Sequence, residues 1–314
     1  MIVTVTLNPA LDQTVEVEGF AISDTNRVCA PLRLDISGKG INVARGVKAL
    51  GFDALACGLA PGQRGRLIEQ QLIDSGIECD FVHVSGETRT NITVLDRSTH
   101  TSTQLLLPGP QLEPAAIDEL HQRLRAHLTP GSWVVLAGSI PPPGDPAIYA
   151  GLIRMATEMA AFTALDADGP VVEVVLASGA YPTLLKMNEY ELSRLCHTEI
   201  DDEQAALKAA RKLQGTGIAN VVITLGGEGA VAVTTDGEYL VRPPQITVES
   251  AVGAGDGFTS GLVCGLVRDG AWEPALTLAA ATGSATCLAQ GNVLRTRADV
   301  EELRPQVRVS RLPE

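Results

Sequence analysis

Residues 252–258 read VGAGDGF, a run of small residues that carries one acid, Asp256, and an apolar stretch with helical spacing follows it. Glycines let backbone N–H groups approach an anion closely, and the start of a helix adds the positive end of its dipole. An acid at that point can take a proton from an attacking hydroxyl. The combination favours phosphoryl transfer to an alcohol, and the alternative is a plain glycine turn before a packed helix.

A second glycine loop, residues 37–42 with the sequence SGKGIN, follows an alternating strand pattern and opens a predicted helix. It is not a Walker loop, because Arg33 stands where that pattern needs glycine and Gly40 where it needs a hydroxyl. It is not a dinucleotide fingerprint either, because Val43 replaces the third glycine. Two glycines, a cation and an amide remain, which suit sugar hydroxyls or a phosphate. The alternative for Lys39 is a solvated loop lysine.

Three charged residues could bind parts of a substrate. Asp12 lies just past the first predicted strand, at the edge where α/β proteins bind ligands, and could accept two vicinal hydroxyls. An Asx turn after Pro9 is the alternative. Arg27 and Arg89 begin strands of a small predicted sheet, where they are either exposed edge charges or the local positive charge that binds a phosphate.

Two further segments could serve a nucleotide and its metal. Asn188 and Glu191 lie one turn apart at the start of a predicted helix, where they could hold the hydration shell of Mg²⁺ or cap the helix. Thr224 ends a buried strand, and the glycines that follow it leave room for a phosphate or ribose. Taken alone, that glycine run is a tight strand connection.

Composition limits the class of protein. The chain has 314 residues, 45% of them hydrophobic and 4% aromatic, and a formal net charge of −13. Such a composition is typical of α/β enzymes whose parallel strands are covered by helices on both faces. The acidic balance argues against nucleic acid or an anionic membrane as partner, and local cations must attract any phosphorylated substrate.

Cysteines, histidines and the amino terminus exclude other classes. The six cysteines are scattered without a C-x-x-C pair, which predicts free thiols, and the five histidines form no zinc pattern. The first residues look like a strand rather than a signal peptide, and charges interrupt the apolar region after Asp256 before it reaches a membrane-spanning length. We therefore expect a cytoplasmic enzyme.

Short β-branched runs alternate with amphipathic stretches along most of the chain, which predicts a mostly parallel sheet covered by helices. The predicted strands are 3–7, 54–59, 133–137, 161–165, 183–187 and 221–225, and the predicted helices are 41–50, 65–74, 114–127 and 202–214. Strict alternation over 28–36 and a hairpin pattern over 91–95 and 102–107 predict a second, small sheet. A sheet that small needs to cover a substrate cleft, another subunit, or both.

Taken in order, these motifs resemble the ribokinase-like sugar kinases, the PfkB family. GKGINVA at 38–44, N-x-x-E at 188–191, TLG-x-x-G at 224–229 and GAGD at 253–256 carry the resemblance over most of the chain. TLNPA-x-D at 6–12, TR-x-N at 88–91, GS-x-P at 138–141 and Gly291 are similar to the sugar-phosphate branch. That branch contains 1-phosphofructokinase, tagatose-6-phosphate kinase and the minor 6-phosphofructokinase.

The resemblance implies a single ribokinase-like domain over 1–314, with a three-layer α/β/α core and a small β-sheet lid inserted as about 12–36 and 88–108. It also implies ATP as phosphate donor, Mg²⁺ as cofactor and a homodimer formed through the lid. Partners other than small molecules, such as nucleic acid or membrane, are not implied.

The resemblance further implies residue roles. Asp256 resembles the catalytic base, and the backbone N–H groups from Gly253 through Ala254 and Gly255 resemble an anion hole. The residues implied to bind the sugar phosphate are Asp12, Arg27, Gly38, Lys39, Gly40, Asn42, Arg89, Asn91 and Ser139. Those implied to bind ATP are Lys186, Asn188, Thr224, Gly226, Gly229, Gly255 and Ser284. Glu191, Asn188 and Asp166 are implied to hold Mg²⁺, partly through water, and Ser250, Val252 and Gly291 a monovalent cation such as K⁺.

Three positions depart from the family pattern. Ala251 stands where relatives of this family carry a threonine, which bears on the monovalent cation more than on catalysis. Met187 replaces the proline that commonly precedes the metal motif. Asp168 adds a carboxylate near the expected phosphates, which could alter metal handling.

The sequence therefore predicts an ATP-dependent kinase that phosphorylates a ketohexose monophosphate. Fructose 1-phosphate, giving fructose 1,6-bisphosphate, is the first hypothesis, because Lys39 lies in the glycine loop. Tagatose 6-phosphate and fructose 6-phosphate are alternatives, since all three acceptors carry a primary hydroxyl and a phosphate at opposite ends. A catalytically silent sugar-phosphate sensor is the alternative from another class, and the intact Asp256 argues against it.

Overall fold

A ten-stranded sheet forms the centre of the computed structural model, which describes residues 1–99, 101–142, 144–289, 291–292 and 296–313. Its strand order is β14-β13-β12-β11-β10-β9-β8-β1-β4-β5. The parallel strands are β1 (Ile2–Thr6), β4 (Ala54–Pro61), β5 (Glu78–Val84), β8 (Trp133–Ala137), β9 (Phe162–Asp166), β10 (Leu184–Asn188) and β11 (Asn220–Thr224). Three antiparallel strands extend one edge: β12 (Ala230–Val233), β13 (Glu238–Arg242) and β14 (Arg308–Arg311).

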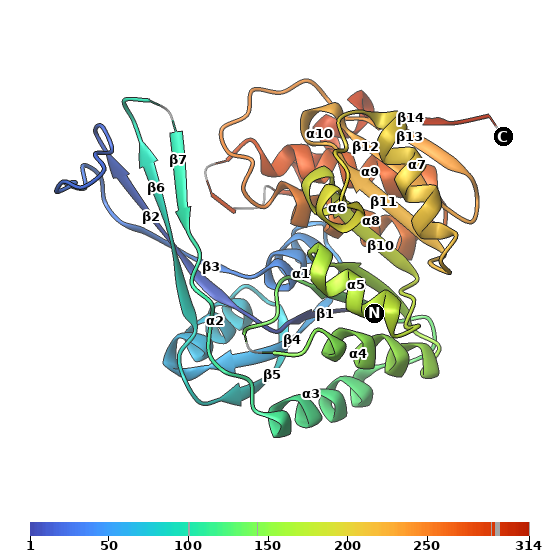
Figure 1. The fold of residues 1–314 in the computed structure, drawn as a ribbon, viewed down its shortest axis with the longest axis horizontal. Coiled ribbons are helices and arrows are strands. Elements are labelled where there is room, and N and C mark those ends of the chain that lie inside the picture. The colour runs from blue at the N-terminus through green and yellow to red at the C-terminus, as the bar shows by residue number, and fades with distance from the viewer. Residues whose placement is uncertain (100, 143, 290, 293–295, 314) are drawn as a thin grey trace.

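Helices cover both faces of this sheet, as Figure 1 shows, which confirms the predicted three-layer α/β/α architecture. One face carries α1 (Lys39–Ala49), α2 (Gly62–Asp74), α8 (Ala254–Asp269), α9 (Trp272–Thr286) and α10 (Arg297–Leu303). The other carries α3 (Pro114–His127), α4 (Ala147–Glu158), α5 (Gly169–Ala177), α6 (Glu189–Cys196) and α7 (Glu203–Gln214). Strand β1 shows the principle: Ile2 packs in one core, and Val3 and Val5 in the other, because successive side chains of a strand point to opposite faces.

A four-stranded sheet, which we call the lid, extends to the left of the core in Figure 1. It comprises β2 (Ala10–Val17), β3 (Arg33–Ser37), β6 (Arg89–Asp96) and β7 (Thr101–Leu105) in the order β3-β2-β6-β7. The alternating segment 28–36 is a continuous strand only from Arg33 onward, and Val28 makes an isolated bridge to Val17. Pro31 explains the interruption, since proline has no N–H to donate to the ladder.

The predicted strand 133–137 and helix 114–127 coincide with β8 and α3, and the other predicted elements shift by a few residues at their ends. Short 3₁₀ turns at Gly226–Glu228 and Arg304–Gln306 complete the described elements. Within the described part of the chain, no helix has the length and apolar character needed to cross a bilayer.

A stripe of glycines brings α8 and α9 into close contact. Gly257, Gly261 and Gly265 recur every fourth residue and therefore lie on one face of α8. A Cβ added at Gly261 would stand 2.6 Å from the carbonyl oxygen of Leu278, and one at Gly265 would stand 2.5 Å from Cα of Ala275. The two helices pack backbone to backbone, which fixes the position of the amino-terminal end of α8.

We expect Gly261→Ala to lower the free energy of unfolding by about 1–3 kcal/mol, because the methyl group meets backbone atoms that cannot rotate away. Urea denaturation measures this loss. Gly215→Ala, at the end of α7, is the matched control, because its nearest neighbours would lie at an ordinary 3.4 Å. Equal stability of wild type and Gly261→Ala would show that the helices separate freely at this point.

Candidate active site

The carboxyl ends of the parallel strands meet at one edge of the sheet. Strands β9, β10 and β11 end at Asp166, Asn188 and Thr224, and neighbouring strands pair in register. The amino-terminal turns of α1 and α8 reach the same edge and bring Lys39 and Asp256 with them. Residues far apart in the sequence are therefore gathered where open α/β sheets bind ligands.

Asp166 is the centre of a buried charge cluster. Its Oδ1 accepts from Nζ of Lys39 at 2.7 Å, and its Oδ2 accepts from Nζ of Lys186 at 3.2 Å and from the hydroxyl of Thr259 at 2.8 Å. Lys39 also donates to Oε1 of Glu191 at 3.0 Å. Asp166 is 1% exposed, so its charge depends on these donors for stabilisation.

The pKa values follow from this arrangement. Burial alone would raise the pKa of Asp166, but the ammonium groups of Lys186 and Lys39 hold it well below its usual range. Burial alone would lower the pKa of Lys39, but the charges of Asp166 and Glu191 outweigh burial and raise it. Asp166 and Lys39 are therefore charged throughout the physiological pH range.

Asp256 lies in the first turn of α8 and is almost fully buried. Its Oδ2 accepts a hydrogen bond from Nδ2 of Asn42 at 2.8 Å. Burial and the negative charge of Asp166 raise the pKa of Asp256 to about 6, although Lys39 and the Asn42 hydrogen bond oppose the rise. A carboxylate with a pKa near neutrality is suited to accept a proton during a reaction.

Backbone donors lie beside this carboxylate. Gly253 adopts a φ of 79° and precedes the first residue of α8, Ala254. The N–H groups of Gly255 and Asp256 belong to the first helical turn, where no helical acceptor is available to them. A Cβ at Gly255 would stand 3.0 Å from Nζ of Lys186, so glycine leaves room for a cation next to these donors. The arrangement can bind an anion.

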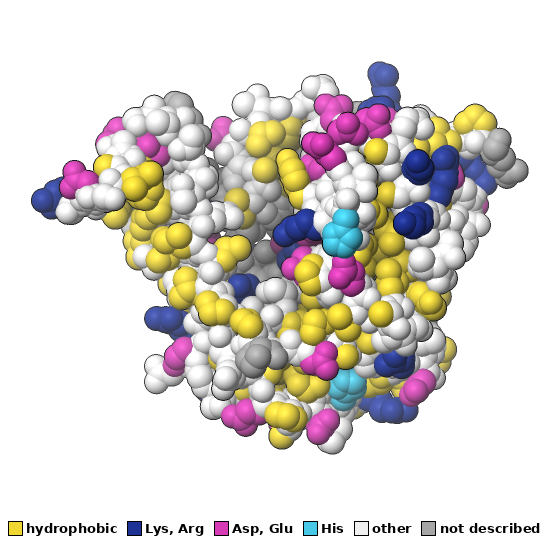
Figure 2. Space-filling model, in the orientation of Figure 1, with side chains coloured by type: hydrophobic (Ala, Val, Ile, Leu, Met, Phe, Trp, Pro, Cys, Tyr) yellow, Lys and Arg dark blue, Asp and Glu magenta, His cyan; other side chains and the backbone are white. Residues whose placement is uncertain are grey.

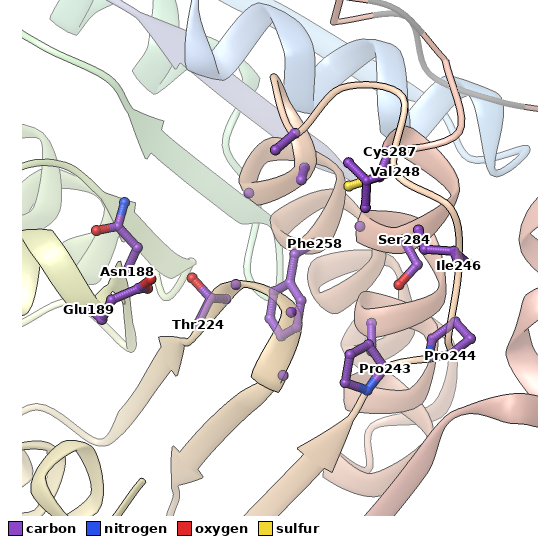
Figure 3. Close-up of a pocket in the computed structure, with 18 of the residues that line it drawn as sticks. Asn188, Glu189, Thr224, Pro243, Pro244, Ile246, Val248, Phe258, Ser284 and Cys287 are labelled. Carbon is purple, nitrogen blue, oxygen red and sulfur yellow. The ribbon is translucent and has the colours of Figure 1, made fainter. Parts of the chain in front are cut away.

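All seven residues implied to bind ATP line one cavity of about 460 Å³. Figure 3 shows Asn188, Glu189 and Thr224 on one side of it and Phe258 between them and the opposite wall. That wall is mostly apolar and is formed by Pro243, Pro244, Ile246, Val248, Ser284 and Cys287. An apolar slot that ends at Lys186 and Gly255 offers a surface for a flat ring and charge for phosphates.

Asn188 and Glu191 make the helix cap that the sequence also allowed. Glu191 N donates to Oδ1 of Asn188 at 2.8 Å, and Asn188 N donates to Oε2 of Glu191 at 2.9 Å. The other oxygen of Glu191, with Asp166, already binds a cation, the ammonium of Lys39. Two such carboxylates fit Mg²⁺, which takes a few protein oxygens plus water and substrate oxygens. A bound Mg²⁺ would neutralise charge on nucleotide phosphates.

The described residues contain no group of three or more His, Cys, Asp or Glu side chains that could hold a metal by themselves. Val252 and Gly291, which were considered for a monovalent cation, fit such a cation less well than Asp166 and Glu191 fit Mg²⁺. Val252 is exposed, and a Cβ at Gly291 would stand 1.7 Å from Nη2 of Arg33, so the guanidinium of Arg33 lies against that glycine. Its positive charge opposes a second cation there.

Figure 2 shows a hollow between the lid and the core. Of the residues implied to bind the sugar, Asp12 and Asn91 lie near the root of the lid, on the paired strands β2 and β6. Asn91 donates to Oδ1 of Asp12 at 2.8 Å across strands β6 and β2. The loop at Gly38 and Gly40 lies directly on the end of β1, because a Cβ at either position would approach Thr6 within 2.8 Å or less. The loop's backbone is therefore held at the cleft.

Arg89 lies at the root of the lid. It donates to the carbonyl oxygens of Leu107 at 3.0 Å and Asn8 at 3.2 Å, and its Nε is buried without a hydrogen-bond acceptor in the structure. Asn8 in turn donates to Ser139 Oγ at 3.1 Å, so Arg89 and Ser139 are close. Arg27 is exposed in the loop between β2 and β3. Lys39, expected at the substrate phosphate, is paired here with Asp166 and Glu191.

Several site residues carried no signal in the sequence. Thr259 binds Asp166 from the second turn of α8, and Phe258 lines the cavity beside it. Asn292 donates to Oδ1 of Asn42 at 3.3 Å from a loop after α9. A helical period could have placed Thr259 near Asp256, but no spacing rule predicts which loop amide packs behind Asn42.

Known proteins are similar to this chain in sequence and in fold. A family model described as pfkB family carbohydrate kinase matches residues 5–296. The chain is 33% identical to tagatose-6-phosphate kinase of Staphylococcus epidermidis, over 92% of this chain and 93% of that protein. It is 31% identical to 1-phosphofructokinase of Bacillus subtilis, over 99% and 100%. The structure matches phosphofructokinase-2 from Escherichia coli in complex with fructose-6-phosphate, with a TM-score of 0.88, 28% identity and coverage of 97% and 98%. Another structure of that enzyme is a complex with potassium.

The raised pKa of Asp256 predicts a stability cost. A buried acid whose folded pKa exceeds its unfolded value favours folding when protonated, so its charge costs stability above the folded pKa of about 6. The cost disappears below the unfolded pKa, about 3.9. We expect Asp256→Asn to unfold with a free energy about 2 kcal/mol higher than wild type near pH 8, and with a much smaller difference near pH 4.

Urea denaturation of both proteins at the two pH values measures this difference, and titrating groups that do not interact with Asp256 cancel in the comparison. Asparagine keeps an oxygen that can accept from Asn42, so the hydrogen bond is retained. A difference that does not grow with pH would show that Asp256 is not destabilised by burial.

Proposed function

Because the chain belongs to the pfkB family of carbohydrate kinases, we propose that this sugar-phosphate kinase transfers the terminal phosphate of ATP to the primary hydroxyl of fructose 1-phosphate. The observation that supports it most is the position of Asp256. The buried carboxylate lies in the same helical turn as Gly255, which lines the cavity of the ATP residues. In this proposal the base, Asp256, and the phosphates of the nucleotide lie on opposite sides of the first turn of α8.

In the proposed reaction, Asp256 takes the proton of the sugar's CH₂OH group as its oxygen attacks the γ-phosphorus. The bond between that phosphorus and the bridging oxygen of ATP breaks, and ADP leaves. The N–H groups at Gly255 and Asp256 and the ammonium of Lys186 stabilise charge on the transferred group. We assign Asp166 and Glu191 to Mg²⁺ and Lys186, Asn188, Thr224 and Ser284 to the nucleotide.

The acceptor's own phosphate is assigned to the region of Arg89 and Ser139, with Arg27 at the lid and Lys39 nearest the metal carboxylates. Asp12 and Asn91 are held together for sugar hydroxyls, with Asn42 beside Asp256. Relatives named 1-phosphofructokinase support fructose 1-phosphate, and the similarity to tagatose-6-phosphate kinase makes tagatose 6-phosphate the second candidate. Fructose 6-phosphate is the third, because phosphofructokinase-2 shares the fold at a TM-score of 0.88.

We expect Asp256→Asn to lower kcat by about 10²–10⁴-fold while acceptor binding is largely kept, because a general base acts in the transition state. Release of ADP is measured for wild type and variant with each of the three sugar phosphates. Among them, we expect fructose 1-phosphate to have the highest kcat/KM with the wild-type protein.

The outcomes separate the hypotheses. Near-normal turnover by Asp256→Asn would refute the assignment of the base. A higher kcat/KM for tagatose 6-phosphate or fructose 6-phosphate would change the assigned substrate but not the assignment of the protein as a kinase. Binding of sugar phosphate without any ADP release by wild type would favour the silent sensor.

We also propose that two copies pair through their lids. Large hydrophobic side chains gather on the lid in Figure 2, and Ile22, Leu32 and Leu34 are 87%, 56% and 49% exposed. Exposed apolar side chains concentrated on a small sheet indicate a surface that another protein covers. The six cysteines are free, which fits the reducing conditions of the cytoplasm, our proposed compartment.

Sedimentation equilibrium tests the pairing. We expect wild type to have about twice the chain mass of 32.9 kDa at micromolar concentration, and the double variant Ile22→Asp with Leu34→Asp to have one chain mass, because buried charges would face each other. Leu67→Asp is the matched control, since Leu67 is similarly exposed on α2, outside the lid. A monomeric wild type would refute the dimer.

A further inference from the structure

Asn292 is a buried amide whose side chain has three hydrogen-bond partners among the described residues. It lies in the loop after α9 and is 3% exposed. Its Nδ2 donates to the carbonyl oxygen of Ile36 at 3.0 Å and to Oδ1 of Asn42 at 3.3 Å. Its Oδ1 accepts from Nη1 of Arg45 at 3.4 Å. Burying a primary amide costs free energy unless such hydrogen bonds are made, so these three bonds are what make an amide stable at this position.

The partners fix which way this amide points. A backbone carbonyl can only accept, so the nitrogen of Asn292 must face Ile36. A guanidinium can only donate, so the oxygen must face Arg45. With both ends decided, the remaining hydrogen of Nδ2 is directed at Asn42.

The orientation of Asn292 fixes the orientation of the Asn42 amide, which contacts Asp256. Because its oxygen receives the hydrogen of Asn292, its nitrogen faces the carboxylate and donates to Oδ2 at 2.8 Å. A flipped Asn42 would place its oxygen against the carboxylate and its nitrogen against the nitrogen of Asn292. Both contacts would be repulsive.

We propose that Asn292 is a positioning residue, which holds Asn42 so that one oxygen of Asp256 is occupied by an amide hydrogen and the other is left for the proton of the acceptor hydroxyl. This rests on the proposed function. Among the described residues Asn292 has no hydrogen bond to Asp256 and reaches it through Asn42, and its Cα and Cβ pack beside Gly253, where an added Cβ would lie 3.4 Å from them.

The lid holds the loop of Asn292 in place. Ile36 belongs to β3, the lid strand that leads into the glycine loop. Arg33 of the same strand lies over Gly291, where any side chain would collide with its guanidinium. Two consecutive loop residues are therefore fitted to β3, and the chain of amides runs from the root of the lid to Asp256.

Two variants of similar size test the role. Asn292→Leu removes all three hydrogen bonds without adding charge, and Asn292→Asp keeps an acceptor for Arg45 but removes both donations. We expect both to lower kcat at least about tenfold and to leave KM for ATP within about twofold, because a small misplacement of a reacting group is costly whereas the nucleotide cavity is untouched. A loss confined to Asn292→Asp would show a charge effect and would contradict the proposal.

Thr282→Val is the matched control. Thr282 is equally buried on the adjoining helix α9, and its hydroxyl donates to Leu278 within that helix, so the variant loses a buried polar group outside the amide chain. We expect it to keep the kcat of wild type. A kcat reduced as much as in Asn292→Leu would show that any disturbance of this region has the same effect, which would overturn the proposal.

A second measurement does not depend on activity. Hydrogen exchange of the side-chain amide of Asn42, assigned by its absence in Asn42→Asp, is followed by NMR without substrate. We expect exchange to be at least about tenfold faster in Asn292→Leu than in wild type, because Asn42 loses its partner. Unchanged exchange would refute the positioning role even if no acceptor is phosphorylated. Faster exchange in Asn292→Leu together with no turnover by wild type would instead keep the positioning role and refute the proposed function. If Asn292→Leu fails to fold, Asn292→Asp decides by the same two measurements.

Discussion

The contact on which the site depends is the buried pairing of Asp166 with Lys39 and Lys186. Strand β9 supplies the acid, and α1 and β10 supply the two ammonium groups, so three elements are held together by these charges. The side chains of Asp166 and Lys186 are 1% and 4% exposed, whereas that of Lys39 is 32% exposed. The balance is incomplete, because Glu191 and Asp256 add two further carboxylates at the same edge. Burial and the negative charge of Asp166 raise the pKa of Asp256, which among the described residues has no hydrogen bond to an ammonium group. The ammonium groups of Lys186 and Lys39 lower the pKa of Asp166 despite its burial, so these two neighbouring acids differ in how readily they exchange a proton.

Local sequence patterns predicted the layers better than they predicted the contacts between them. Helix α3 and strand β8 coincide with their predicted bounds, because their period and end signals agree. Helix α5 reads GPVVEVVLA, where β-branched residues obscure the helical period, and Pro170 at its first turn is the local sign of a helix. The family resemblance, carried by the glycine loops and the N-x-x-E spacing, implied the ATP residues, all of which line one cavity. The pairing of Lys39 with residues 127 and 152 positions away was beyond any local rule.

One short motif meets two structural demands at once. Asn188 and Glu191 satisfy the first turn of α6 through a reciprocal cap, and Glu191 keeps its second oxygen at the charge cluster. Because the cap fixes both side chains, the carboxylate would already be oriented for the Mg²⁺ that we propose there. The structure shows the helix cap, and the cap is compatible with the proposed metal site because it uses only one oxygen of Glu191.

Strand β1 of the core continues into strand β2 of the lid through only Leu7, Asn8 and Pro9, all of them buried. Asn8 is tied to Pro108 and Ser139 by its side chain and to Arg89 by its carbonyl oxygen. A connection this short and this constrained acts as a fixed pivot rather than as a flexible hinge. Movement of the lid must then take the form of a twist spread along β2 and β6, small at the root and largest at the far tip. Such a motion would change the shape of the cleft's mouth while the floor that we propose to bind the sugar keeps its geometry.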